Sequence, residues 1–324
     1  MKIVFLGSGA FGIPALQALA ASAHQVLHVI SQPDRPAGRG KHVAPTPVSE
    51  WAMGAGLPLA RTENVNAPEM LELLRAIKPE CLVAIAFGQK LSEELLAITP
   101  HRGINLHASL LPRYRGAAPI NWAIIDGNAQ AGVCVIELVN RMDAGDIFAS
   151  AATPIGQEET AGELHDRLAR LGAPLVPGVL DEMEAATVRR EAQDEAAASK
   201  ARKLSRELAW VDFTQPAALV SARMRGLSPW PGVQLELVDA AGKSRGMATV
   251  LKCIAVGEAV HAPDTCGGVL ADRTVACGSG SLQIITVQPA GKKAMDLQAF
   301  ANGYGFTPGA RVKSIVLPPA SAQC

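Results

Sequence analysis

The sequence predicts an α/β protein in which a doubly wound parallel sheet is followed by a smaller β-barrel. Short apolar runs alternate with helical patterns over roughly the first 130 residues, as they do in a sheet that carries helices on both faces. After residue 205 this alternation gives way to short β-rich runs separated by Gly and Asp. A length of 324 residues, 48% of them hydrophobic, is enough for two domains with separate cores.

The first domain is expected to contain four buried strands with helices between them. Each strand is an apolar run without polar alternation, which is typical of strands covered on both faces. The strands are expected at residues 2–6, 25–31, 80–87 and 103–107. The first helix follows the first strand and ends at about residue 22, and further helices are expected at about 67–77, 91–98, 117–126 and 160–184.

A change of composition separates the two domains. Residues 189–203 (RREAQDEAAASKARK) are charged and Ala-rich and have no apolar stripe, which predicts a linker. We therefore expect a catalytic domain at 1–188, a linker at 189–205 and a second domain at 206–324. The β-rich runs of the second domain lie at 233–238, 247–256, 267–271, 274–277 and 281–288.

A glycine-rich loop follows the first strand and fits the pattern G-x-G-x-x-G at residues 7–12 (GSGAFG). In dinucleotide-binding proteins such a loop holds a pyrophosphate, and an acidic residue about 20 positions later binds the ribose. Asp34 has this spacing, but it follows Pro33 and lies outside the second strand. A tight turn that packs a helix on the sheet is the simpler interpretation, and a dinucleotide-dependent oxidoreductase stays as an alternative.

The net charge of zero hides an uneven distribution. Residues 1–115 carry a charge of +3, residues 116–198 of −9 and residues 199–324 of +6. The positive charge of the first and last segments is therefore compatible with a nucleic-acid partner.

Cysteine spacing and hydropathy indicate a cytoplasmic protein. None of the 6 cysteines has the C-x-x-C spacing of a metal or redox site, so we expect reduced thiols and no metal. Glycines and Pro14 interrupt the first apolar stretch, which is unlike a secretory signal. No run of 18 apolar residues predicts a membrane span.

Residues 32–47 (QPDRPAGRGKHVAPTP) form a Pro- and Gly-rich loop with basic side chains at Arg35, Arg39 and Lys41. Glycines on both sides of Arg39 allow the backbone to approach a partner closely. Guanidinium and ammonium groups bind phosphate oxygens. The loop is either a nucleic-acid contact or an ordinary solvated loop.

Two polar residues stand on one face of a strand that is otherwise apolar. Asn105 and His107 are two positions apart, so both side chains project from the same face. Polar groups on a buried strand are costly unless a ligand or a hydrogen-bond network uses them. Asp143 lies in a turn between two β-rich runs and is the expected third member of a catalytic group.

These residues and their surroundings resemble the 10-formyltetrahydrofolate-dependent formyltransferase superfamily. Its signature combines N-x-H and SLLP with a D-x-G-D turn; the chain has NLHASLLPRYRGAAPIN at 105–121 and MDAGD at 142–146. Within the superfamily, QPDRPAGRGK (32–41) and QPAGKKAM (288–295) are similar to the formyltransferases that act on methionyl-tRNA. The first glycine loop departs from the more frequent G-T-P-x-F of this family.

The resemblance implies a Rossmann-like first domain, an OB-like second domain and formyl transfer from 10-formyltetrahydrofolate to the α-amine of methionyl initiator tRNA. Asn105 and His107 would donate hydrogen bonds to an oxyanion, and Asp143 would orient His107. The folate would lie against Ile85, Phe87, Gly88, Ser109, Leu110, Leu111 and Pro112; the tRNA would contact Arg35, Arg39, Lys41, Lys292 and Lys293. We expect a monomer that needs no metal.

Other functions would use parts of the same set. A formyltetrahydrofolate hydrolase would need the three polar residues but no second domain. A sugar-nucleotide formyltransferase shares the central motif and needs a nucleotide-sugar pocket. A non-catalytic tRNA-binding protein would not need Asn105, His107 and Asp143 together.

Overall fold

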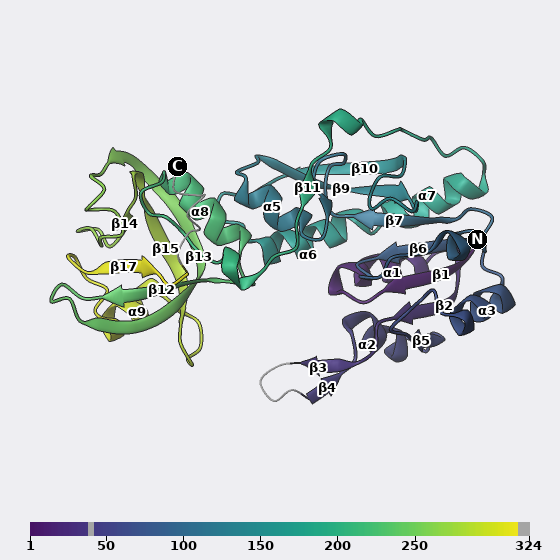
Figure 1. The fold of residues 1–324 in the computed structure, drawn as a ribbon, viewed down its shortest axis with the longest axis horizontal. Helices are drawn as coiled ribbons and strands as arrows, with labels where there is room; N and C mark the ends of the chain where they lie inside the picture. The colour runs from purple at the N-terminus through teal and green to yellow at the C-terminus, as the bar shows by residue number, and fades with distance from the viewer. Residues whose placement is uncertain (38–41, 317–324) are drawn as a thin grey trace. The chain divides into compact units, whose positions relative to one another are not determined.

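A computed structural model describes residues 1–37 and 42–316 and divides the chain into two compact units (Figure 1). The first unit consists of Met1–Gly116, Gly132–Thr153 and His165–Lys200. The second consists of Ala117–Ala131, Pro154–Leu164 and the chain from Ala201 onward. Two stretches that we expected in the catalytic domain, 117–131 and 154–164, therefore pack within the second unit. The ranges 1–188, 189–205 and 206–324 stay a prediction for the functional domains.

The first unit is built on a seven-stranded sheet with the order β10-β9-β7-β6-β1-β2-β5. Five strands run parallel through the pairs β1–β2, β1–β6, β2–β5 and β6–β7, which confirms the Rossmann-like class. The edge differs from the expectation because β9 pairs antiparallel with β7. The strands are β1 (Lys2–Gly7), β2 (Gln25–Ser31), β5 (Leu59–Arg61), β6 (Cys81–Ile85), β7 (Gly103–His107), β9 (Gln130–Glu137) and β10 (Ile147–Pro154).

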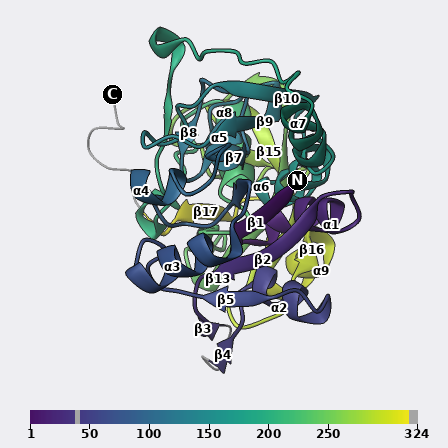
Figure 2. The same cartoon turned by 90° about the vertical axis from the view of Figure 1, so that its right-hand side faces the viewer.

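Helices cover both faces of this sheet, as Figure 2 shows for α3 and α4 on one side and α1 and α7 on the other. Val4 and Leu6 of β1 and Leu82 of β6 pack in one apolar cluster with residues of α3 and α4. The predicted helix at 160–184 is two helices, because Pro174 begins the second one. The helices are α1 (Ile13–Ala20), α2 (Pro47–Gly54), α3 (Pro68–Ile77), α4 (Glu93–Leu96), α6 (Ala161–Gly172) and α7 (Leu175–Glu184), with a 3-10 turn η1 (Ala10–Gly12) before α1.

The second unit contains an antiparallel, nearly closed barrel, which confirms the class that the sequence predicts. Its strands follow the order β14-β15-β13-β12-β17. Single bridges from Val269 to Val275 and from Gly268 to Arg311 connect the two ends of this order. The strands are β12 (Val233–Val238), β13 (Ser244–Val260), β14 (Val275–Ala276), β15 (Ser279–Pro289), β16 (Met295–Asp296) and β17 (Arg311–Ser314); the helices are α5 (Pro119–Ile125), α8 (Ala217–Gly226) and α9 (Leu297–Tyr304), with a 3-10 turn η3 (Arg206–Leu208).

The predicted linker begins with an ordered segment, residues 189–200, which we call the strap. Glu191 and Ile147 exchange backbone hydrogen bonds of 2.9 and 2.8 Å, so the strap is tied to the start of β10. Arg115 N–H donates to Ser199 O at 2.8 Å. The strap therefore has partners in the first unit. It includes η2 (Glu195–Ala197) and the start of β11 (Lys200–Ala201), which pairs with β8 (Arg115–Gly116).

Candidate active site

Strand β7 presents Asn105 and His107 on the face of the sheet opposite to Leu106. Leu106 packs toward α6, where a side-chain carbon added to Gly172 would meet the Leu106 methyl groups at 2.8 and 2.9 Å. Asn105 is half-buried and His107 is buried. The period of two along a strand therefore places both polar side chains together, as the sequence predicts.

His107 lies between two acceptor atoms. Its Nε2 is 2.9 Å from the backbone oxygen of Tyr114, and its Nδ1 is 3.5 Å from Oδ1 of Asp143. The side chains of His107 and Asp143 are only 7% and 14% exposed. An imidazolium that carries a proton on each nitrogen satisfies both acceptors, whereas a neutral ring satisfies one.

Asp143 connects the predicted catalytic residues. Its Oδ1 accepts a hydrogen bond from Nδ2 of Asn105 at 3.4 Å, and its Oδ2 accepts one from the backbone N–H of Gly116 at 2.9 Å. The backbone of Asp143 has φ of +51°, in the left-handed region that Asp tolerates better than most residues. The structure thus brings Asn105, His107 and Asp143 together.

The turn that carries Asp143 requires a glycine two positions later. A Cβ on Gly145 would lie 2.0 Å from the backbone oxygen of Glu137. Sequence reasoning missed a further partner of this turn, Gln193, whose Nε2 donates to the backbone oxygens of Asp143 and Gly145 at 2.9 and 2.7 Å. No sequence pattern marks Gln193, because it stands in a charged, Ala-rich segment.

The first glycine loop forms its hydrogen bonds with other residues of the chain. The backbone N–H groups of Ser8 and Gly9 both donate to the oxygen of Ala86, at 3.3 and 3.2 Å. A Cβ on Gly9 would lie 3.1 Å from that of Ala86. Asp34 pairs with Arg61 at 2.8 Å. The groups that would hold a dinucleotide thus have protein partners, and the loop serves packing.

The predicted folate residues fall into two segments. Ile85 and Phe87 are buried, and Gly88 follows them with φ of +78°. Phe87 O accepts a hydrogen bond from Nε2 of Gln32 at 2.7 Å.

In the second segment, Leu111 packs with the buried side chains of Cys134 and Ile136. The Ser109 hydroxyl donates to Arg113 O at 2.7 Å. Leu110 and Pro112, the remaining members of this segment, are half-buried. The role of these seven residues in folate binding stays a prediction.

The predicted tRNA contacts are exposed where the structure describes them. Arg35 begins β3 (Arg35–Ala37), which pairs with β4 (His42–Ala44), and its Nη2 lies 3.4 Å from Oε2 of Glu63. Arg39 and Lys41 lie outside the described residues. Lys292 and Lys293 are exposed in the turn between β15 and β16.

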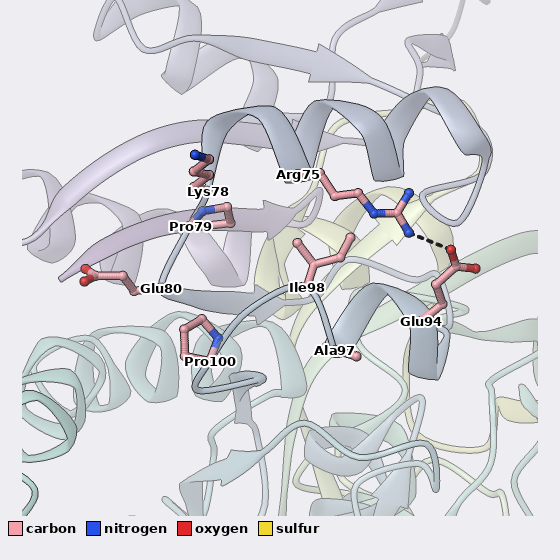
Figure 3. Close-up of a pocket in the computed structure, with 8 residues that line it drawn as sticks. All are labelled: Arg75, Lys78, Pro79, Glu80, Glu94, Ala97, Ile98 and Pro100. Atoms are coloured by element: carbon pink, nitrogen blue, oxygen red, sulfur yellow. Dashed lines mark hydrogen bonds and ion pairs between the residues drawn. The ribbon is translucent and has the colours of Figure 1, made fainter.

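A surface pocket of the first unit lies apart from these residues (Figure 3). It sits where β6 and β7 begin, and an ion pair of 2.7 Å joins Arg75 and Glu94 beside it. Its lining residues are Arg75, Lys78, Pro79, Glu80, Glu94, Ala97, Ile98 and Pro100, and none of them is a predicted site residue. The pocket is therefore not the candidate active site.

Comparison with known proteins finds relatives that match nearly the whole chain. Residues 1–180 match the family described as formyl transferase, and residues 203–305 match the formyl transferase C-terminal domain. The methionyl-tRNA formyltransferase of Moorella thermoacetica is 41% identical over 309 residues, which cover 95% of this chain and 98% of that protein. The methionyl-tRNA formyltransferase of Trichlorobacter lovleyi is 39% identical over 314 residues, with 95% and 96% covered.

Solved structures share the fold at low identity. WlaRD, a sugar 3N-formyl transferase crystallised with dTDP and 5-N-formyl-THF, has a TM-score of 0.64 at 14% identity and covers 90% of this chain and 99% of its own. HypX from Aquifex aeolicus, in complex with tetrahydrofolic acid, has a TM-score of 0.60 at 19% identity, with 94% and 47% covered. From the family matches and the full-length relatives, the chain belongs to the formyl transferase family, and within it to the methionyl-tRNA formyltransferases.

Proposed function

We propose that this chain transfers the formyl group of 10-formyltetrahydrofolate to the α-amino group of methionine on initiator tRNA. The observation that carries the proposal is the cluster of Asn105, His107 and Asp143 on and beside β7, in a chain whose full-length relatives are methionyl-tRNA formyltransferases. The product is N-formylmethionyl-tRNA, the form of the initiator used to begin translation.

The chemistry needs little help from a strong base. An α-amine has a pKa of about 7.7–8.0, so a useful neutral fraction exists near pH 7. Its nitrogen attacks the formyl carbon, and the carbonyl electrons move to oxygen. When the bond between carbon and N10 breaks, the amine loses a proton and N10 gains one.

The three residues match the charges that develop. The Asn105 amide donates an N–H to the oxyanion, and such a donor is worth about 10²–10³ in rate. His107 supplies a second donor once it exchanges one of its two protein acceptors, Tyr114 O or Asp143 Oδ1, for the substrate oxygen. The Asp143 carboxylate holds the ring in place and stabilises its positive charge.

The folate donor would lie along the segments 85–88 and 109–112. Because Ile85 and Phe87 are buried in the core, the backbone groups of this segment would flank the pterin ring. Leu110 and Pro112 would form the opposite wall.

The tRNA would be bound by exposed cations of both units. Arg35 forms one surface ion pair, which costs little to exchange for a phosphate. Arg39 and Lys41 would extend this contact from the same loop, and Lys292 and Lys293 would contact backbone phosphates.

The proposed reaction belongs in the cytoplasm, where aminoacylated tRNA is found, and we expect one chain to perform it. Among residues 1–37 and 42–316, no helix has the length and apolar character to cross a membrane.

The test is a formyl-transfer assay with purified protein, 10-formyltetrahydrofolate and three acceptors. These are methionyl initiator tRNA, methionyl elongator tRNA and an amino-sugar nucleotide. We expect formylmethionine on the initiator and no formylated sugar. Formylation of the sugar alone would identify a sugar-nucleotide formyltransferase, and formate released without any acceptor product would identify a hydrolase.

A further inference from the structure

The side chain of Gln193, in the strap, is hydrogen-bonded at both ends of its amide. Its Nε2 donates to Asp143 O at 2.9 Å and to Gly145 O at 2.7 Å. Its Oε1 accepts from Nε and Nη2 of Arg115 at 2.9 and 2.7 Å. The residue is half-buried. Four hydrogen bonds on one amide use its full donor capacity and fix its orientation.

The two backbone oxygens that Gln193 holds belong to the turn that aims the Asp143 carboxylate. Asp143 has a positive φ, and Gly145 leaves no space for a side chain, so the turn has one narrow conformation. Fixing both carbonyl groups therefore fixes the direction in which Asp143 leaves the backbone.

The other end of the Gln193 amide reaches the second loop of the site. Arg115, which donates to Oε1, follows Tyr114, whose backbone oxygen contacts His107. The adjacent Gly116 donates its N–H to Asp143. Gln193 thus connects the loop that contacts His107 with the turn that carries Asp143.

We propose that Gln193 is a positioning residue for formyl transfer, which it serves by fixing the turn of Asp143 against the loop of Arg115. The inference rests on the proposed function. It assigns a role in the reaction to a segment that the sequence shows only as a linker. Gln193 itself touches no reacting atom, so its effect passes through Asp143.

Gln193→Glu removes the donor function of the amide and keeps its acceptor function. The carboxylate keeps the size of the side chain and still accepts from Arg115, but it cannot donate to the oxygens of Asp143 and Gly145. We expect kcat to fall about 10–100-fold, because displacing a catalytic group by about 1 Å has effects of this size. KM for methionyl initiator tRNA is expected to stay within twofold.

Glu191→Gln is the matched control, because it makes the reverse chemical change in the same strap at an exposed side chain. It should leave kcat unchanged. Thermal unfolding of both variants is measured in parallel. A loss of kcat in Gln193→Glu at an unchanged Tm supports positioning, and a loss that merely follows a fall in folded protein overturns it.

A double-mutant cycle with Asp143→Asn tests the route of the effect. If Gln193 acts through Asp143, adding Gln193→Glu to the Asp143→Asn variant lowers the single-turnover rate only slightly further. Equal rate losses in both backgrounds would overturn the inference. A wild-type protein that forms no formylmethionyl-tRNA would instead refute the proposed function, and the inference would fall with it; an active wild type with a fully active Gln193→Glu refutes the inference alone.

Discussion

At the scale of single residues, the site is defined by what surrounds His107. Both of its ring nitrogens face oxygen acceptors, from Tyr114 and from Asp143. The carboxylate in turn accepts from Asn105 and from Gly116. The nearly buried Asp143 carboxylate thus has an imidazole and two N–H donors as neighbours, an arrangement that suits the proposed stabilisation of charge during acyl transfer.

Replacing His107 by Ala should reduce formyl transfer while tRNA binding persists, because we propose that the ring acts on the reacting group and not on the nucleic acid. We expect a loss of kcat of about 10²–10³. His101→Ala is the control, since this exposed histidine precedes the same strand. The comparison uses steady-state rates together with the Kd of methionyl initiator tRNA. A weaker Kd with unchanged kcat would assign His107 to binding.

The sequence could predict Asn105, His107 and Asp143 because a strand of period two and a glycine-bounded turn leave a visible pattern. Gln193 leaves none. It lies 50 residues from Asp143 along the chain, and its hydrogen bonds go to backbone oxygens, which are the same for every residue type. Contacts of this kind become visible only in three dimensions.

At the scale of elements, the turn after β9 depends on one glycine. Gly145→Ala would place a carbon 2.0 Å from a backbone oxygen that cannot move away without breaking β9. We expect a clear fall in Tm and loss of activity. Gly178→Ala is the matched control, since its added carbon meets no atom within 4 Å in the middle of α7. It should stabilise the protein by about 0.5–1 kcal/mol. Equal Tm changes in the two variants would contradict this account of the turn.

The strap is held to the site by a carboxylate as well as by Gln193. Hydrogen bonds from Arg115, and then from Arg141, lower the pKa of Glu195 to about 2. A lowered pKa means that the contribution of this carboxylate to stability is complete above its ordinary pKa of 4.5 and is lost as the pH falls toward 2.

Glu195→Gln should therefore lower the urea midpoint relative to the wild type at pH 7, and the difference should shrink as the pH falls from 4.5 toward 2. Urea unfolding curves across this range measure it. Because Glu195 is exposed, the difference at pH 7 is expected to be small. A difference that grows on acidification would show that these ion pairs do not hold the strap.

The buried strands β1, β2, β6 and β7 were predictable from sequence, whereas several helices were not, for a physical reason visible in α8. This helix partly buries Arg225, which donates to the backbone oxygen of Glu159, and Arg223, which donates to that of Trp210. Burial lowers the pKa of Arg223 to about 10. Ala217, Val220 and Met224 face the core, but partly buried arginines between them weaken the apolar stripe by which an amphipathic helix is recognised.

At the scale of the whole molecule, the basic excess lies in the segments that carry the proposed tRNA contacts. Residues 199–324 carry +6, and residues 116–198 carry −9. Each phosphate contact contributes a slope of about 0.7–0.9 to the dependence of log K on log salt. Neutrality of the whole chain is thus compatible with a salt-dependent complex.

Replacing Lys292 and Lys293 together by Ala should weaken tRNA binding and lower this slope by about 1.4–1.8. Lys78→Ala is the control, because this exposed lysine lies at the pocket of the first unit. Binding isotherms at several salt concentrations provide the slopes. An unchanged slope in the double variant would remove the turn between β15 and β16 from the tRNA interface.

We propose that the polar cluster of Asn105, His107 and Asp143 performs the chemical step. The most direct measurement is the single-turnover rate of formyl transfer to methionyl initiator tRNA, with enzyme and 10-formyltetrahydrofolate saturating, in the wild type and in Asn105→Ala. We expect a rate about 10²–10³ lower in the variant, at unchanged affinity for tRNA. A variant rate within threefold of the wild-type rate would contradict it.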